Sequence, residues 1–124
     1  MMMKPIFKGI DHIQIAAPSG SEEKAREFYG KLLGMQEIEK PESLKARGGC
    51  WFQCGTQEVH IGIQPDFVPA KKAHPGFTVN NLTLLKSQLE DAACLISEEP
   101  PIEGRARFFA HDPFGNRIEF LEYV

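Results

Sequence analysis

The order of strand-like and helix-like segments constrains the fold of this 124-residue chain more than any other feature. Period-two and period-3.6 patterns predict one strand, one amphipathic helix and three strands, and the second half of the chain repeats that order. Self-similarity at about half the chain length indicates two structurally related modules. The expected segments are 10–17, 21–33, 35–40, 47–54 and 58–64, followed by 74–79, 81–93, 95–99, 105–111 and 117–123.

Both expected helices have start signals. Ser19 or Ser21 is expected to cap the first helix, and Asn80 or Asn81 the second. Residues 65–73 contain two prolines and two lysines and are the expected linker. We therefore expect an α+β fold in a single domain of residues 1–124. Its two βαβββ modules, about 8–64 and 74–124, would form a curved mixed sheet around a cavity, with the helices outside.

Composition and charge exclude several classes of function. The net charge is −3 with no basic block, so neither nucleic acid nor an anionic membrane is an expected partner. No apolar run approaches the roughly 20 residues of a spanning helix. The first residues do not resemble a signal peptide, so the expected location is the cytoplasm. The three cysteines are expected to be buried, reduced thiols.

Strand alternation places four ligand-capable side chains opposite the helices. In each strand concerned, the apolar set faces a helix, which leaves His12, His60, His74 and Glu119 on the other face. Three imidazoles and a carboxylate on one concave face have the composition of a transition-metal site. They suit a divalent ion of zinc, iron, manganese, nickel or cobalt.

The same alternation identifies candidate substrate-binding residues. Gln14 shares a face with His12, and Trp51 and Gln53 alternate with the apolar residues of their strand. Arg107 and Phe109 share a face, although the pattern leaves open whether that face is the inner one. If it is, Arg107 could bind an anionic group of a substrate through a bidentate contact. Arg105 is interpreted as a solvated charge.

Three sequence motifs resemble those of the vicinal-oxygen-chelate superfamily, which includes glyoxalases, bleomycin-resistance proteins and extradiol dioxygenases. The segment 10–15 is similar to the opening strand of that superfamily, and 27–35 to the end of its first helix. The segment 109–120 resembles its aspartate-proline, glycine-asparagine and glutamate ending. The resemblance implies that His12, His74 and Glu119 are metal ligands. His60 falls where glyoxalase I proteins place a glutamate.

The resemblance also implies a function. A small metal-dependent enzyme of lyase, isomerase or thiol-transferase type would bind neighbouring oxygens of a small substrate, and Glu119 would act as a catalytic base. One alternative is a non-catalytic protein that sequesters a small molecule or antibiotic; another is an extradiol-type dioxygenase. Single-domain chains of this superfamily often complete their cavities across subunits, so a homodimer is expected.

Overall fold

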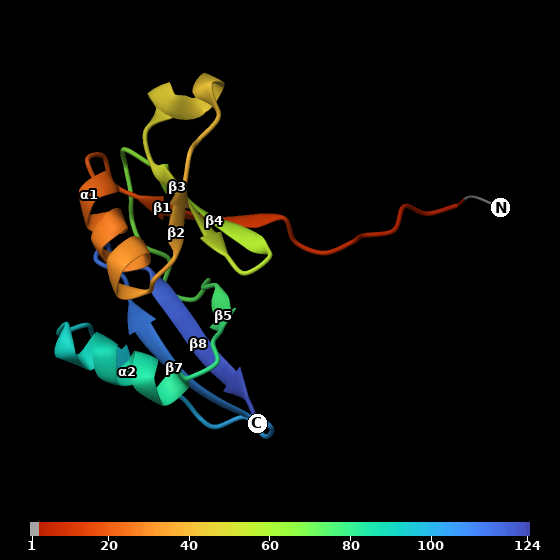
Figure 1. The fold of residues 1–124 in the computed structure, drawn as a ribbon, viewed down its shortest axis with the longest axis vertical. Helices are drawn as coiled ribbons and strands as arrows, with labels where there is room; N and C mark the ends of the chain where they lie inside the picture. Colours follow the sequence, from red (N-terminus) through yellow and green to blue (C-terminus); the bar gives the residue numbers. More distant parts are fainter. Residues whose placement is uncertain (1–2) are drawn as a thin grey trace.

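The strands form two separate four-stranded sheets in the computed structural model, which describes residues 3–124 (Figure 1). The first sheet has the order β1-β4-β3-β2 and the second has the order β5-β8-β7-β6. In each sheet, the strand that comes first in the chain pairs in parallel with the one that comes last, β1 with β4 and β5 with β8. All other neighbouring strands are antiparallel. The strands are β1 His12–Ala17, β2 Gln36–Ile38, β3 Cys50–Cys54, β4 Gln57–Ile63, β5 Gly76–Thr78, β6 Ile96–Ser97, β7 Arg105–His111 and β8 Arg117–Tyr123.

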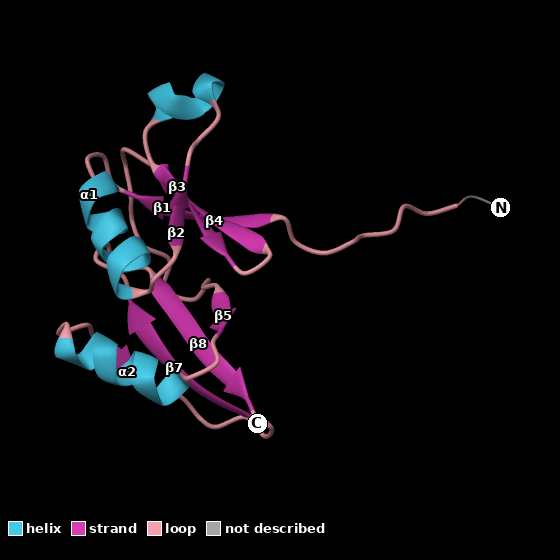
Figure 2. Ribbon diagram, viewed as in Figure 1, coloured by secondary structure: helices cyan, strands magenta, loops and turns pink. Residues whose placement is uncertain are grey.

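One helical segment follows the first strand of each module, which confirms the predicted α+β fold with two βαβββ modules. In the first module, α1 (Glu22–Ala25) continues directly into the π-helix η1 (Arg26–Leu32). In the second, α2 spans Leu82–Asp91. Both helical segments lie on the same side of the molecule, and the two sheets do not close on each other (Figure 2).

The helical segments bury their apolar faces against the sheets. Phe28 and Tyr29 of η1 are buried, as is Leu89 of α2. Gly30 of η1 also faces the sheet, because a Cβ atom there would lie in van der Waals contact, 3.5 Å, with the ring of Phe52. The first helix is thus amphipathic, as its sequence pattern predicts, and its apolar side is the one that packs. The largest fully buried side chains are Tyr29, Phe52, Phe108, Phe120, Ile61, Leu89 and Ile118.

The segment before β3 differs from the sequence expectation. A strand was expected from residue 47, but Glu42–Arg47 forms a 3-10 helix and β3 begins at Cys50. Gly48 and Gly49 both have positive φ, at 75° and 84°. A Cβ atom on Gly49 would lie 2.0 Å from the carbonyl oxygen of Ile61, so only glycine fits this approach to β4.

A buried polar network joins the two modules through Asp112, in the turn between β7 and β8. The hydroxyl of Tyr29 donates to Asp112 Oδ2 at 2.7 Å. Asn116 Nδ2 donates to Asp112 Oδ2 and to the carbonyl oxygen of Ala16, each at 2.8 Å. The other carboxylate oxygen accepts the backbone N–H groups of Phe114 and Asn116. Burial and the nearby Asp112 carboxylate raise the pKa of Tyr29 well above its usual value.

The first residues of the described chain extend away from the sheets (Figure 1). Ile6 and Phe7 in this arm are 87% and 96% exposed. No helix among residues 3–124 is long and apolar enough to cross a membrane.

Candidate metal and substrate site

In the second module, a histidine and a glutamate face each other across neighbouring segments. His74 lies two residues before β5, and Glu119 lies on β8, where it pairs with Gly76. His74 Nε2 is 3.1 Å from Glu119 Oε1, and His74 Nδ1 is 2.9 Å from the carbonyl oxygen of Lys72. A carbonyl oxygen only accepts, so Nδ1 donates to it and a neutral imidazole presents the lone pair of Nε2 to the carboxylate. Two acceptors this close require a proton or a cation between them.

Two further side chains hold this pair in place. Arg107 Nη1 donates to Glu119 Oε2 at 3.3 Å, and Arg107 Nη2 donates to the carbonyl oxygen of Pro100 at 2.7 Å. The ring of Phe109 packs edge-on against His74, with centroids 4.9 Å apart. Phe108 and Ala110, which alternate with these residues, lie in the apolar core. Arg107, Phe109 and Glu119 therefore share the face of the second sheet that is turned away from α2.

In the first module, three aromatic rings stack. His60 lies between Trp51, with centroids 3.7 Å apart and planes within 1°, and His12, with centroids 4.2 Å apart. His60 is 5% exposed, and its Nε2 contacts Glu58 Oε1 at 2.9 Å. His12 is exposed, and its Nδ1 contacts Asp11 Oδ2 at 2.9 Å. If Nδ1 donates, the Nε2 lone pair of His12 remains free for a further ligand.

The four predicted metal ligands are thus brought together as two pairs. His12 contacts His60 in the first module, and His74 contacts Glu119 in the second. Among residues 3–124 there is no group of three histidine, cysteine, aspartate or glutamate side chains placed to hold a metal ion. One copy of the chain therefore presents two separate pairs of ligand-capable side chains, which we call the first half-site (His12 and His60) and the second half-site (His74 and Glu119).

The remaining predicted substrate residues fall in two places. Gln53 Nε2 donates to the carbonyl oxygens of Gly55 and Gln57, which engages it in the turn between β3 and β4. Gln14 is exposed on β1 and lies over Gly62, where an added Cβ atom would be 2.5 Å from Gln14 Nε2. Gln14 and His74 line a common cavity of about 430 Å³.

That cavity lies at the junction of β1, β8 and the segment between the modules. Sequence reasoning did not single out Arg117, which also lines it. Arg117 is two residues before Glu119 on β8, so strand alternation could have placed the two side chains on one face. The cavity lining consists of Ile13, Gln14, Ile15, Ala16, Gln64, Phe67, Val68, Ala70, Ala73, His74, Pro75, Asn116 and Arg117.

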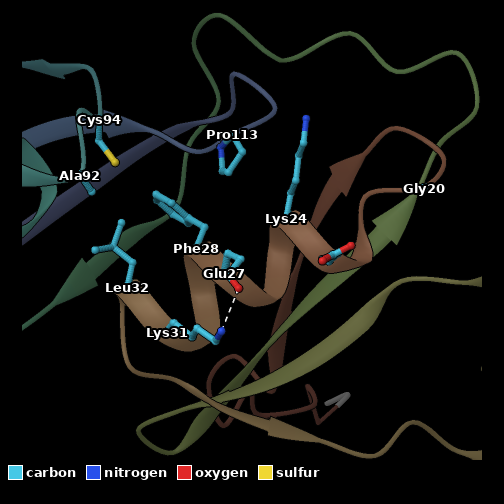
Figure 3. Close-up of a pocket in the computed structure, with 10 residues that line it drawn as sticks. Gly20, Lys24, Glu27, Phe28, Lys31, Leu32, Ala92, Cys94 and Pro113 are labelled. Atoms are coloured by element: carbon cyan, nitrogen blue, oxygen red, sulfur yellow. Dashed lines mark hydrogen bonds and ion pairs between the residues drawn. The ribbon is translucent and has the colours of Figure 1, made fainter.

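A larger hollow of about 770 Å³ lies on the helical side of the molecule (Figure 3). Phe28 and Leu32 of η1 point across it toward Cys94 and Ala92, with Lys24 at its rim (Figure 3). None of the predicted site residues lines it.

The three cysteines form no disulfide within residues 3–124; Cys50 is buried as predicted, whereas Cys54 and Cys94 are only half-buried. Cys50 is buried on β3, and burial raises its pKa to about 11. Burial also raises the pKa values of Cys54 and Cys94. At neutral pH these groups are therefore protonated and are poor metal ligands.

Comparison with known proteins agrees with this fold. The profile of the Glyoxalase/Bleomycin resistance protein/Dioxygenase superfamily matches residues 9–120. The Arabidopsis thaliana protein named Glyoxylase I 4 is 30% identical over 122 residues, covering 89% of this chain and 68% of that protein.

Solved structures are similar as well. The crystal structure of a glyoxalase family protein from Bacillus anthracis is 51% identical, with a TM-score of 0.93, over 98% of this chain and 100% of that one. A fosfomycin resistance protein from Listeria monocytogenes, complexed with Mn(II) and 1S,2S-dihydroxypropylphosphonic acid, is 14% identical with a TM-score of 0.79, over 96% and 95% of the two chains. The chain belongs to the glyoxalase/bleomycin resistance protein/dioxygenase superfamily.

Proposed function

We propose that this protein is a divalent-metal-dependent enzyme that acts on a small substrate carrying neighbouring oxygens, with Glu119 as its catalytic base. The contact between His74 and Glu119 carries the proposal. His74 Nε2 and Glu119 Oε1 lie 3.1 Å apart, and Nδ1 donates to the carbonyl oxygen of Lys72, so a neutral ring would direct the lone pair of Nε2 at the carboxylate. A backbone carbonyl that orients the ring of a histidine ligand is a common feature of metal sites.

The donor set fits such an ion when a second copy of the chain is included. His74 and Glu119 of one copy supply a nitrogen and an oxygen, and His12 of a second copy supplies a further nitrogen. The exposed position of His12 supports this role, and so does the lone pair that Nε2 retains if Nδ1 donates to Asp11. His60 is sandwiched between two rings with its Nε2 on Glu58, so we propose that it positions His12. Zinc, iron, manganese, nickel and cobalt all accept such ligands.

The bound ion would polarise the substrate oxygens and stabilise the negative charge that develops on them. The chain's own residues would prepare Glu119 for its part. Arg107 holds one oxygen of the Glu119 carboxylate, and Phe109 keeps the His74 ring in place. The other carboxylate oxygen, Oε1, would hold the ion. If it left the ion, it could take a proton from a substrate carbon or hydroxyl, as lyase or isomerase chemistry requires.

Mixing two inactive variants tests the shared site. In His12→Ala the first half-site is lost, and in Glu119→Gln the second is lost. If the site forms between copies, a mixed dimer contains one site with both changes and one intact site. We expect zinc binding, measured by calorimetry, to be lost in each variant alone and to return in part when the two are mixed under exchanging conditions.

The oligomeric state and the metal content provide independent checks. Light scattering at micromolar concentration should give a dimer, and protein purified without chelator should contain a divalent metal. If no mixture of the two variants recovers zinc binding and light scattering gives a monomer, the proposal is wrong. Glu103→Gln serves as a control, because Glu103 is exposed and lies outside both half-sites.

A metal-independent binding protein is the second candidate. The observation that favours it is the absence of a third ligand near His74 and Glu119 within residues 3–124. On this alternative the ion pairs of Glu119 with His74 and Arg107 are structural, and the cavity beside them sequesters a small molecule. Ligand binding that is equally tight before and after chelation would favour this alternative over the enzyme.

A further inference from the structure

We propose that Arg117 binds a carboxylate or phosphonate group of the substrate in the cavity of about 430 Å³ beside His74. This inference rests on the proposed function, because it assigns the substrate class of that same site. The substrate would carry neighbouring oxygens at one end and an oxyanion group a few bonds away.

Arg117 is held in a fixed orientation before any ligand arrives. Its guanidinium carbon lies 4.0 Å from the centroid of the Phe109 ring, and its Nη2 donates to Glu99 Oε1 at 2.8 Å. The side chain is 19% exposed. Its other guanidinium nitrogens make no hydrogen bond to residues 3–124 and are not among the buried unpaired atoms. These donors are therefore oriented and available, as recognition of an oxyanion requires.

The cavity around Arg117 is otherwise nearly uncharged. Arg117 is the only aspartate, glutamate, lysine or arginine among its lining residues. The lining contributes amide groups from Gln14, Gln64 and Asn116, and the remaining residues apart from His74 are apolar. A mostly apolar cavity of this size with a few convergent polar groups is typical of a small-molecule site. Glu99 lies outside this lining and accepts from Nη2 of Arg117, so an anion in the cavity would meet the remaining N–H donors of that guanidinium.

Arg107, which sequence reasoning favoured for an anion, is committed elsewhere. Its Nη1 and Nη2 donate to Glu119 and to the carbonyl oxygen of Pro100, and its Nε is buried without a partner. Arg107 is also absent from the cavity lining. Both guanidinium groups lie over the ring of Phe109, at 4.0 Å for Arg117 and 5.5 Å for Arg107. The two arginines therefore have different roles: Arg107 holds Glu119, and Arg117 faces the ligand.

The position of Arg117 would place the bound anion close to His74 and Glu119, the proposed metal ligands. Phe109 contacts the His74 ring on one side and the Arg117 guanidinium on another. His74 and Arg117 therefore share Phe109 as a neighbour, and both line the cavity. The segment between the modules contributes only apolar side chains to the cavity wall, from Phe67, Val68, Ala70 and Ala73.

Glycerate and glyceramide form a matched pair of probes. Both carry two neighbouring hydroxyls, and they differ in having a carboxylate or a neutral amide. We expect glycerate to bind about tenfold more tightly than glyceramide in nuclear magnetic resonance titrations of the full chain in the presence of EDTA. The preference should persist without metal because it comes from Arg117. The titrations are then repeated with zinc in place of EDTA.

Variants assign the preference to a residue. Arg117→Gln should reduce the ratio of the two dissociation constants to about one, and Arg117→Lys should retain part of it. Arg105→Gln is the matched control, because Arg105 lies over Tyr123 on the same sheet and does not line the cavity. Thermal melting of each variant shows whether it is folded. The comparison of the two probes on the unmodified protein remains informative if Arg117→Gln does not fold.

Several outcomes would overturn the inference. They are equal affinity for the two probes, no measurable binding of either, or an unchanged preference in folded Arg117→Gln. A preference that appears only with zinc would assign the anion to the metal, which overturns the role of Arg117 and leaves the proposed metal site intact. Preference for glycerate in EDTA, together with no zinc binding, would instead retain the anion subsite and contradict the proposed metal-dependent enzyme.

Discussion

The two modules repeat one order of elements but place different chemistry at corresponding positions. On β4 the first module carries His60, stacked between two rings, and on β8 the second carries Glu119, which faces an imidazole. His12, at the start of β1, is exposed, whereas His74, just before β5, is fixed by a backbone carbonyl. A repeated fold therefore does not imply a repeated site. We infer that one module supplies an oriented pair and the other a single free donor.

The largest expected effect distinguishes the corresponding residues Glu119 and His60. Glu119→Gln should weaken zinc binding on the order of a hundredfold or more, because it removes a charged ligand. His60→Gln should weaken it only about tenfold, since it removes a neighbour that positions a ligand. Calorimetric titration with zinc measures both, with Glu103→Gln as the control. Equal losses at the two positions would mean that the modules contribute alike, and the asymmetry would then be wrong.

The next effect concerns the contact that ties the modules together. Tyr29→Phe removes the hydroxyl that donates to the buried Asp112 carboxylate, so we expect a loss of about 2 kcal/mol in the free energy of unfolding. Tyr123→Phe is the matched control, because that ring is 63% exposed, and it should change stability by less than about 0.5 kcal/mol. Urea unfolding measures both. If the two variants lose the same stability, the network does not couple the modules energetically.

The repeated order of elements could be predicted from sequence because each strand and helix has its own pattern. The bounds of β7 and β8 agree with the expected segments, since both strands alternate and the turn through Asp112 separates them. The expected strand 74–79 is reduced to Gly76–Thr78, and Pro75, which has no N–H, precedes it. The π-helical winding, in which Leu33 N donates to Phe28 O, has no local signal in the apolar pattern.

The candidate site was predictable only in part. Alternation places His60 with Trp51, and Glu119 with Arg107 and Phe109, on shared faces, as the contacts of these side chains show. It could not reveal that the two pairs are separate in one chain, because a strand pattern carries no information about how two sheets are placed. Nor could it show that Arg107 is committed to Glu119 while Arg117 faces the cavity.

The smallest effect compares how the helices begin. Asn81 Oδ1 accepts the backbone N–H of Leu84 and caps α2, whereas Ser21 makes no side-chain cap and its hydroxyl instead donates to the carbonyl oxygen of Pro18. Asn81→Ala should therefore cost about 1 kcal/mol of unfolding free energy, and Asn81→Ser should recover most of it, because a serine hydroxyl can accept the same N–H. Urea unfolding of the two variants measures the difference. If Asn81→Ser is as destabilised as Asn81→Ala, the side-chain cap does not stabilise α2. The starts of the two helices would then not differ in their contribution to the free energy of unfolding.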